Sequence, residues 1–132
     1  APIFEVQNNA ATVKYLEVNA DEVKTETQAY SAEHALADGT NIATNCALGN
    51  VHSVTLAGNR TLDNPTNLKA GATYLWIITQ DGTGSRTLAY GTVFKFPDGF
   101  TPTLSTGIGA VDILSGVSDG TNVYCNLLGD FS

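Results

Sequence analysis

The sequence predicts an all-β protein, a β-sandwich or a jelly-roll-like barrel with an extended N-terminal arm. Short apolar runs alternate along the chain with turn residues, which is the pattern of an all-β domain. Thirteen Gly residues punctuate the 132-residue chain, and few stretches suit a long helix. A hydrophobic content of 42% is typical of a globular protein. We therefore expect one β domain plus an arm.

The run from Tyr74 to Thr79 is the most hydrophobic and β-prone part of the chain and contains its single Trp. Gly71 precedes the run and Asp81-Gly82 follows it, so turn residues bracket it on both sides. A short apolar run between turn residues is typical of a strand that is buried on both faces. We expect this strand to be the centre of the core.

Residues 1–27 are predicted to be the arm, and residues 28–132 the β domain. Segments 1–6 and 12–18 have strand character. One hypothesis is an arm that adds a strand to a neighbouring chain, and the alternative is a frayed terminus. Under the first hypothesis the candidate contact residues are Ile3, Phe4, Val6 and Tyr15.

The β domain is expected to consist of short strands joined by turns. Segment 28–36 fits neither the strand period nor the helical period, so both alternatives stay open. In the run 50–56, Val54 and Leu56 alternate on one face. The other strands expected outside the central run are 40–47, 61–62 and 121–128.

The triplet Asp-Gly-Thr occurs three times, at 38–40, 81–83 and 119–121. Asp-Gly before a Thr- or Val-rich run is a strong signal for a β-hairpin turn, because Gly tolerates the positive φ that such turns require. A calcium loop would need several oxygen ligands at alternate positions and a distal carboxylate, which these loops lack. The triplets are therefore predicted turns.

Cys46 and Cys125 lie in β-like runs, where small buried hydrophobic residues are expected; we favour two free thiols, with a disulfide between them as the alternative. His34 and His52 are not spaced with the cysteines as zinc ligands are. No metal and no other cofactor is expected. Thirteen acidic residues against six basic ones give a net charge of −7, which argues against a nucleic-acid partner. No apolar run approaches the ~20 residues that span a membrane, so no membrane partner is expected.

No catalytic pattern is present, since the chain has neither a Gly-x-Ser-x-Gly elbow nor a complete dinucleotide fingerprint. A glycosidase needs two carboxylates that meet in space, and four aspartates are candidates. Three of them lie in turns, where Asp is expected: Asp63, Asp81 and Asp98. Asp112 lies inside an apolar run and needs a partner there, with Arg86 or Lys95 as the available cations. We interpret Asp112 and Arg86 as a structural anchor and predict no enzyme and no catalytic residue.

Several segments together resemble a module that recurs in the structural proteins of tailed bacteriophages. One of them reads Asn-Val-His-Ser-Val-Thr-Leu-Ala-Gly-Asn-Arg-Thr-Leu, at 50–62. The others lie at 64–67, 71–74, 80–88, 102–106, 111–114 and 119–124. In that family the module often closes the C-terminal end of tail-fibre, tail-spike or head-associated chains. The resemblance covers roughly residues 40–131 and implies a virion protein.

A small, acidic β domain with an arm resembles the decoration (cement) proteins of phage heads. This resemblance implies a homotrimer on the head surface, made in the host bacterial cytoplasm, with the major capsid protein as partner. A decoration protein that binds only the mature shell of the head would stabilise that mature shell, because binding shifts the equilibrium toward the bound state. The arm would contact the capsid, and an aromatic loop would serve subunit packing or outward display, through Phe94, Phe96 and Phe100. A loop that fills the core of its own domain is an equal alternative for these three residues.

The alternative is a tail-fibre or tail-spike receptor-binding module. It would bind host glycans through exposed aromatic side chains such as Phe100, Tyr90 or Trp76. Two further alternatives are a glycan-degrading enzyme, which needs paired carboxylates in a groove, and a component of the tail tube or baseplate.

Overall fold

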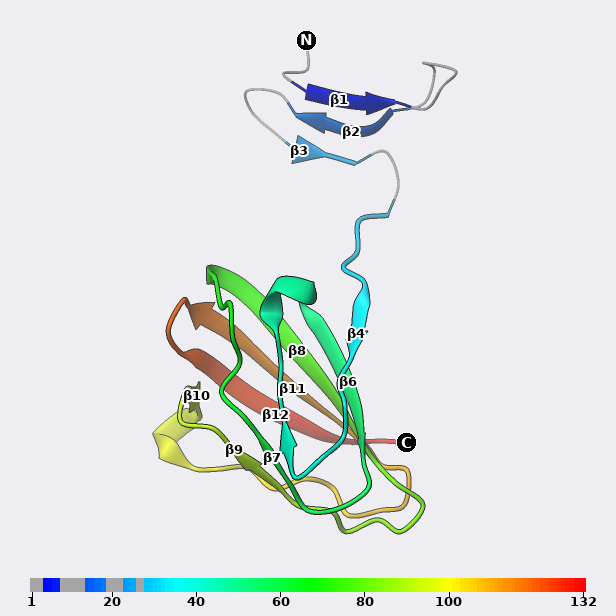
Figure 1. Cartoon of the computed structure of the whole chain (residues 1–132), viewed down its shortest axis with the longest axis vertical. Helices are drawn as coiled ribbons and strands as arrows, with labels where there is room; N and C mark the ends of the chain where they lie inside the picture. The colour runs from blue at the N-terminus through cyan, green and yellow to red at the C-terminus, as the bar shows by residue number, and fades with distance from the viewer. Residues whose placement is uncertain (1–3, 8–13, 19–22, 26–27) are drawn as a thin grey trace. The chain divides into compact units, whose positions relative to one another are not determined.

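The computed structural model describes residues 4–7, 14–18, 23–25 and 28–132 (Figure 1). The chain divides into two compact units, Ala1–Tyr30 and Ser31–Ser132. Among the described residues, regular structure consists of strands and two short 3-10 helices. The prediction of an all-β protein is therefore confirmed. The predicted boundary after residue 27 stays a prediction.

The first unit contains a small antiparallel sheet. Its strands are β1 (Phe4–Gln7), β2 (Lys14–Val18) and β3 (Val23–Lys24), in the order β1-β2-β3. Strand β2 lies within the predicted segment 12–18, and β1 overlaps the predicted segment 1–6 and extends one residue beyond it. The described parts of the predicted arm thus pair with each other. This pairing gives hydrogen-bond partners to backbone N–H and C=O groups that a single extended segment would leave unpaired.

The second unit is built from two sheets. The larger has the order β10-β12-β11-β8-β6-β4, and the smaller has the order β5-β7-β9. The strands are β4 (Glu33–Ala35), β5 (Asn41–Ile42), β6 (Val51–Leu56), β7 (Arg60–Leu62), β8 (Ala70–Gln80), β9 (Leu88–Tyr90), β10 (Phe94–Lys95), β11 (Val111–Asp119) and β12 (Val123–Phe131). The 3-10 helices are η1 (Cys46–Leu48) and η2 (Pro97–Gly99).

From β4 to β9 the chain crosses from one sheet to the other with every strand. As a result β4, β6 and β8 pair in parallel in the larger sheet, and β5, β7 and β9 pair in parallel in the smaller one. The antiparallel strands β11 and β12 then extend the larger sheet. A sandwich or jelly roll is not confirmed, and the all-parallel small sheet differs from the antiparallel strands of a jelly roll.

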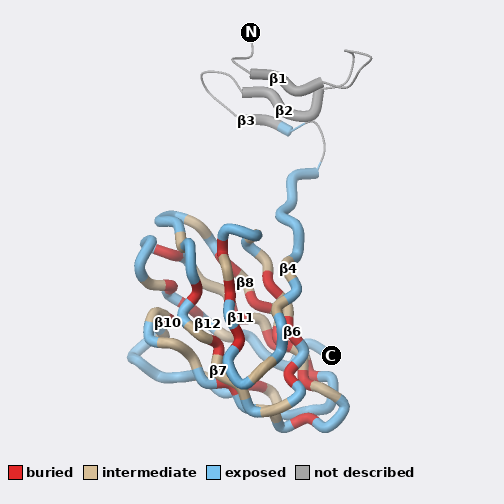
Figure 2. Tube along the Cα trace, in the orientation of Figure 1, coloured by how far each residue is buried: buried red, intermediate tan, exposed pale blue. Residues whose placement is uncertain are grey.

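The core lies between the two sheets, along the buried stripes in Figure 2. Ile42, Leu62 and Leu88 come from the smaller sheet, and they share one hydrophobic cluster with side chains of the larger one. In β8, Tyr74, Trp76, Ile78 and Gln80 are buried, whereas the alternate residues, such as Leu75 and Ile77, are half-buried. The expectation that this strand is buried on both faces is therefore wrong, because the smaller sheet lies against one face only.

The Asp-Gly turns are present, but only one joins paired neighbours. Asp119 Oδ1 accepts hydrogen bonds from the amides of Thr121 and Asn122, at 2.8 and 2.7 Å, in the turn between β11 and β12. Gly120 in that turn has a φ of 93°. The turns at Asp38 and Asp81 carry the chain from one sheet to the other, so they are not hairpins.

Candidate functional site: an aromatic cleft beside β10 and β12

The three Phe side chains of the aromatic loop lie in different environments. Phe94 is buried and meets Trp76 edge to face, with ring centroids 5.3 Å apart. Phe96 is half-buried against Tyr90, at 4.9 Å between centroids. Phe100 is 82% exposed. The loop residues predicted as one group therefore have different roles, and only Phe100 is displayed.

The turn η2 separates these rings. Asp98 and Gly99 have φ values of 53° and 70°, and the amide of Phe100 donates to the carbonyl of Pro97 at 3.0 Å. This left-handed turn redirects the chain directly after Phe96. As a consequence Phe100 leaves the core that contains Phe94.

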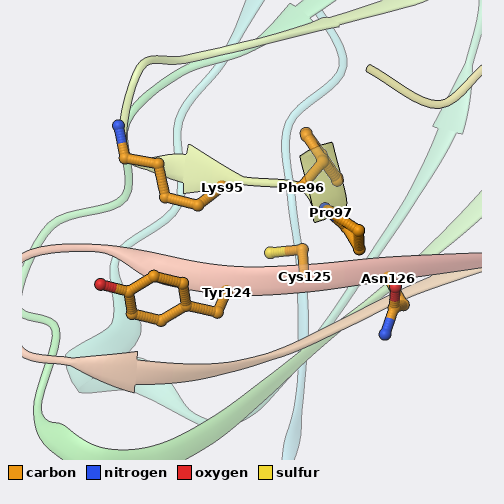
Figure 3. A pocket seen from close by; sticks show the side chains of 6 residues that line it. All are labelled: Lys95, Phe96, Pro97, Tyr124, Cys125 and Asn126. Carbon is orange, nitrogen blue, oxygen red and sulfur yellow. The ribbon is translucent and has the colours of Figure 1, made fainter. Parts of the chain in front are cut away.

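A cleft of about 260 Å³ opens where β10 leaves β12 (Figure 3). The parallel pairing of the two strands ends at Lys95 and Tyr124. Pro97 then begins η2 and has no N–H for a sheet. The backbone of β12 at Cys125 and Asn126 therefore lies at the floor of an opening. The lining residues are Lys95, Phe96, Pro97, Tyr124, Cys125 and Asn126.

Tyr124 is the exposed aromatic side chain of the cleft, whereas Phe96 is half-buried. Tyr124 is 52% exposed, and its hydroxyl donates to Asp119 Oδ2 at 3.0 Å. This hydrogen bond raises the pKa of Tyr124. Backbone amides of Asn122 and Thr121 lower the pKa of Asp119 to about 2, so the acceptor is ionised at neutral pH. The phenol is thereby held at its outer end while its ring remains accessible.

The polar groups of the cleft are an ammonium and an amide. Lys95 Nζ donates to the carbonyl of Thr92 at 2.7 Å, which fixes the ammonium beside β10. Asn126 is exposed, and Figure 3 shows it on the same side of β12 as Tyr124. Cys125 points to the opposite side, toward Phe96 and Pro97. The arrangement offers an aromatic ring and an amide to a bound molecule, while the Lys95 ammonium points away from Tyr124 and Asn126 (Figure 3).

Both cysteines are free and buried. Burial raises the pKa of Cys46 to about 11 and that of Cys125 to about 12. The thiol of Cys125 donates to the carbonyl of Val123 at 3.3 Å. Since the thiolate is the reactive form, neither side chain is suited to nucleophilic chemistry at neutral pH.

The expected pairing of Asp112 with a cation is wrong. Asp112 is buried, and its two oxygens accept hydrogen bonds from the amides of Ser105 and Asp130, at 2.7 and 2.9 Å. Arg86 instead pairs with Asp81, at 2.8 Å between Nη2 and Oδ2. Backbone amides can satisfy a buried carboxylate as a cation would. Asp112 thus links the loop before β11 to the end of β12 by itself.

Two histidines that are distant in sequence meet in the structure. Because β4 and β6 pair in parallel, His34 lies opposite His52, and their Nδ1 atoms are 3.3 Å apart. His52 is fully buried and stacks on Trp76, at 5.6 Å between ring centroids. Burial lowers the pKa of His52 to about 4, so the buried ring is neutral at pH 7.

The other predicted site residues do not gather at this cleft. Trp76 is completely buried and Tyr90 half-buried, so neither is the exposed aromatic contact that the receptor-binding alternative named. Of the predicted arm contacts, Ile3 lies outside the described residues; Phe4 and Val6 fall in β1 and Tyr15 in β2. Among the described residues, no three metal-ligating side chains cluster and no helix has the length and apolarity to span a membrane.

A comparison with protein families finds a match to most of the second unit. Residues 35–123 match the family described as "Putative phage tail fibre C-terminal domain". Searches among curated proteins and among solved structures returned no match. The matched range lies within the second unit and includes the β10 side of the cleft, and it ends just before Tyr124.

Proposed function

Because this chain belongs to the phage tail fibre C-terminal domain family, and is therefore a phage structural protein associated with the virion, we propose that it recognises the host surface. The resemblance to a phage structural module is confirmed by the family match. Capsid decoration and a place on the head surface receive no support from it, and the tail-fibre alternative fits it better. We therefore do not retain the major capsid protein as partner.

The single observation that carries the proposal is the aromatic cleft. A sugar ring has a face of C–H groups, which stacks on an aromatic side chain, and a rim of hydroxyls, which need hydrogen-bond partners. Tyr124 supplies the ring, and Asn126 supplies an amide that both donates and accepts. At about 260 Å³ the cleft is smaller than most drug-sized pockets, and it suits one sugar unit at a time. Surface carbohydrate is the proposed ligand class.

The proposed activity is binding without chemistry. The cleft residue Cys125 is protonated at neutral pH, and the nearby carboxylate of Asp119 is occupied by two backbone amides and a phenol. A glycosidase would need one carboxylic acid and one carboxylate flanking the bond to be broken. We therefore retain the prediction that the protein is not an enzyme and uses no cofactor.

The remaining parts of the chain support the cleft in this proposal. We propose that the two facing sheets form a rigid sandwich, in which β10 and β12 at one edge of the larger sheet keep the shape of the cleft.

Self-association as a homotrimer remains part of the proposal. Sedimentation velocity on the full chain measures the oligomer number directly.

The test is binding to bacterial surface polysaccharides presented on an array. Tyr124→Ala removes the exposed ring of the cleft, and loss of a central aromatic contact typically weakens binding tenfold or more. Phe100→Ala is the matched control, because Phe100 lies in the same unit, is 82% exposed and does not line the cleft. We expect weaker binding for Tyr124→Ala and unchanged binding for the control. Equal binding by Tyr124→Ala and the unmodified chain would remove the cleft from the proposal.

A further inference from the structure

A second cavity lies between the segments that follow β8 and precede β11. Its volume is about 260 Å³, and its walls are residues 85–88 on one side and Thr103, Leu104 and Thr106 on the other. Figure 1 shows these two loops at the same end of the β domain. The cavity shares no lining residue with the aromatic cleft. It is therefore a separate opening.

The walls of this cavity are held together by a buried amide. Gln80 is buried, and its Nε2 donates to the carbonyls of Arg86 and Ser105, at 2.9 and 2.8 Å. Its Oε1 accepts from the amide of Arg86 at 2.8 Å. The amide of Ser85 also donates to the carbonyl of Thr106 at 2.9 Å. Both walls are thus fixed before any ligand binds, which lowers the entropy that binding must overcome.

The lining combines an apolar floor with a hydroxyl rim. Leu88 and Leu104 are buried and supply the floor. The rim carries four exposed hydroxyl side chains, which make no side-chain hydrogen bond to any part of the chain that the structure describes: Ser85, Thr87, Thr103 and Thr106. Each hydroxyl offers one donor and two acceptor positions. These groups are free to bind a ligand or water.

The cavity offers no uncompensated charge. Arg86 lines it, but two of its guanidinium nitrogens donate to Asp81, at 3.1 and 2.8 Å. That ion pair lowers the pKa of Asp81 to about 2, so the pair stays intact over the physiological range. An anionic ligand would have to compete with this carboxylate. A neutral ligand that places a C–H face on the leucines and hydroxyls on the rim meets no such competition.

We propose that this cavity is a second carbohydrate-binding site, selective for a neutral sugar ring. The inference rests on the proposed function, since it assigns the same ligand class to another part of the same domain. Two sites on one domain can engage neighbouring units of one polysaccharide or two separate chains. Either arrangement raises the apparent affinity above that of a single weak site.

The experiment is a titration of the isotopically labelled full chain, followed by amide chemical shifts. The probes are the methyl glycosides of glucose, galactose, mannose and N-acetylglucosamine, with N-acetylneuraminic acid as the anionic comparison. The double variant Thr87→Val and Thr103→Val removes two hydroxyls at constant shape. Thr101→Val is the matched control, because Thr101 is exposed and outside the cavity. We expect saturable shifts of the 85–88 and 103–106 amides, weakened about five-fold per hydroxyl removed and unchanged in the control.

The outcomes separate this inference from the proposed function. Shifts confined to the amides of 95–97 and 124–126 would support the aromatic cleft and overturn the second site. Shifts confined to the amides of 85–88 and 103–106 would support the second site and would overturn the aromatic cleft as the binding site of the proposed function. Stronger binding of N-acetylneuraminic acid than of the neutral glycosides at the cavity would overturn its neutral selectivity. No saturable shift with any probe would overturn both.

Discussion

The buried imidazole of His52 makes the stability of the β domain depend on pH in a defined window. Its folded pKa is about 4, against an ordinary value of 6.5, because burial disfavours the charged ring and His34 lies beside it. A histidine with a lowered folded pKa stabilises the fold fully above pH 6.5. That stabilisation is lost as the pH falls toward 4, because the unfolded chain takes up the proton first.

The magnitude follows from the two pKa values. From pH 7 to pH 5 the linkage costs about 2 kcal/mol of unfolding free energy, and the full shift corresponds to about 3 kcal/mol. The carboxylates of Asp81 and Asp119 have pKa values of about 2, so the stability they contribute is lost only below about pH 4. The two windows are separate. A loss of stability above pH 5 therefore reports on the histidine.

The assay is urea unfolding at pH 7, 6 and 5, followed by the fluorescence of Trp76, which stacks on His52. His52→Leu should abolish the loss between pH 7 and pH 5. His34→Asn is the matched control and should keep most of it, because burial is the larger cause of the shift. If the unmodified chain and His52→Leu lose the same free energy over this range, the reasoning is refuted.

The remaining predictions concern the link that Asp112 makes between the backbone amides of Ser105 and Asp130. Asp112→Asn replaces one acceptor oxygen by a donor, so one of the two buried amides loses its partner, and we expect a loss of about 2–3 kcal/mol in urea unfolding. Asp63→Asn, whose carboxylate bonds the exposed Asn41, should cost less than about 1 kcal/mol. Gly129→Ala would place a Cβ 2.7 Å from Asp112 Oδ1 and from Ser105 Oγ, so we expect thermal unfolding to show a loss of about 1–3 kcal/mol. Gly82→Ala meets nothing within 4 Å and should leave the melting temperature nearly unchanged; equal losses in both variants would contradict the packing argument.

Local patterns in the sequence predicted local features well. The bracketed run around Trp76 is the core of β8, and the last Asp-Gly turn joins β11 to β12. Val54 and Leu56 are buried on the same face of β6. Segment 40–47 was predicted less well, since only Asn41–Ile42 form a strand before η1 begins. Turn chemistry and alternation act over a few residues, so they can be read without the partners.

The aromatic site was predicted only in part. Three Phe within one short loop indicated a functional segment, yet Phe94 belongs to the core and Phe100 to the surface. Tyr124 and Asn126 were not predicted as site residues, although their alternation with the buried Cys125 is a signal that they lie on an exposed face. Their neighbours in the cleft are about thirty residues earlier in the chain. No spacing rule connects them.

By itself the sequence determined the all-β class, the position of the central strand, the turns and the phage structural family, because periodicity, turn chemistry and motif are properties of contiguous residues. Tertiary structure alone decided which segments meet. The crossing of the chain between two sheets makes β4 and β6 parallel neighbours and so places His34 against His52. The pairing of β11 with β12 and the path of the loop before β11 likewise give Asp112 two backbone amides instead of Arg86. Such contacts join residues far apart in the chain, and they depend on strand order and register, which single residues do not specify.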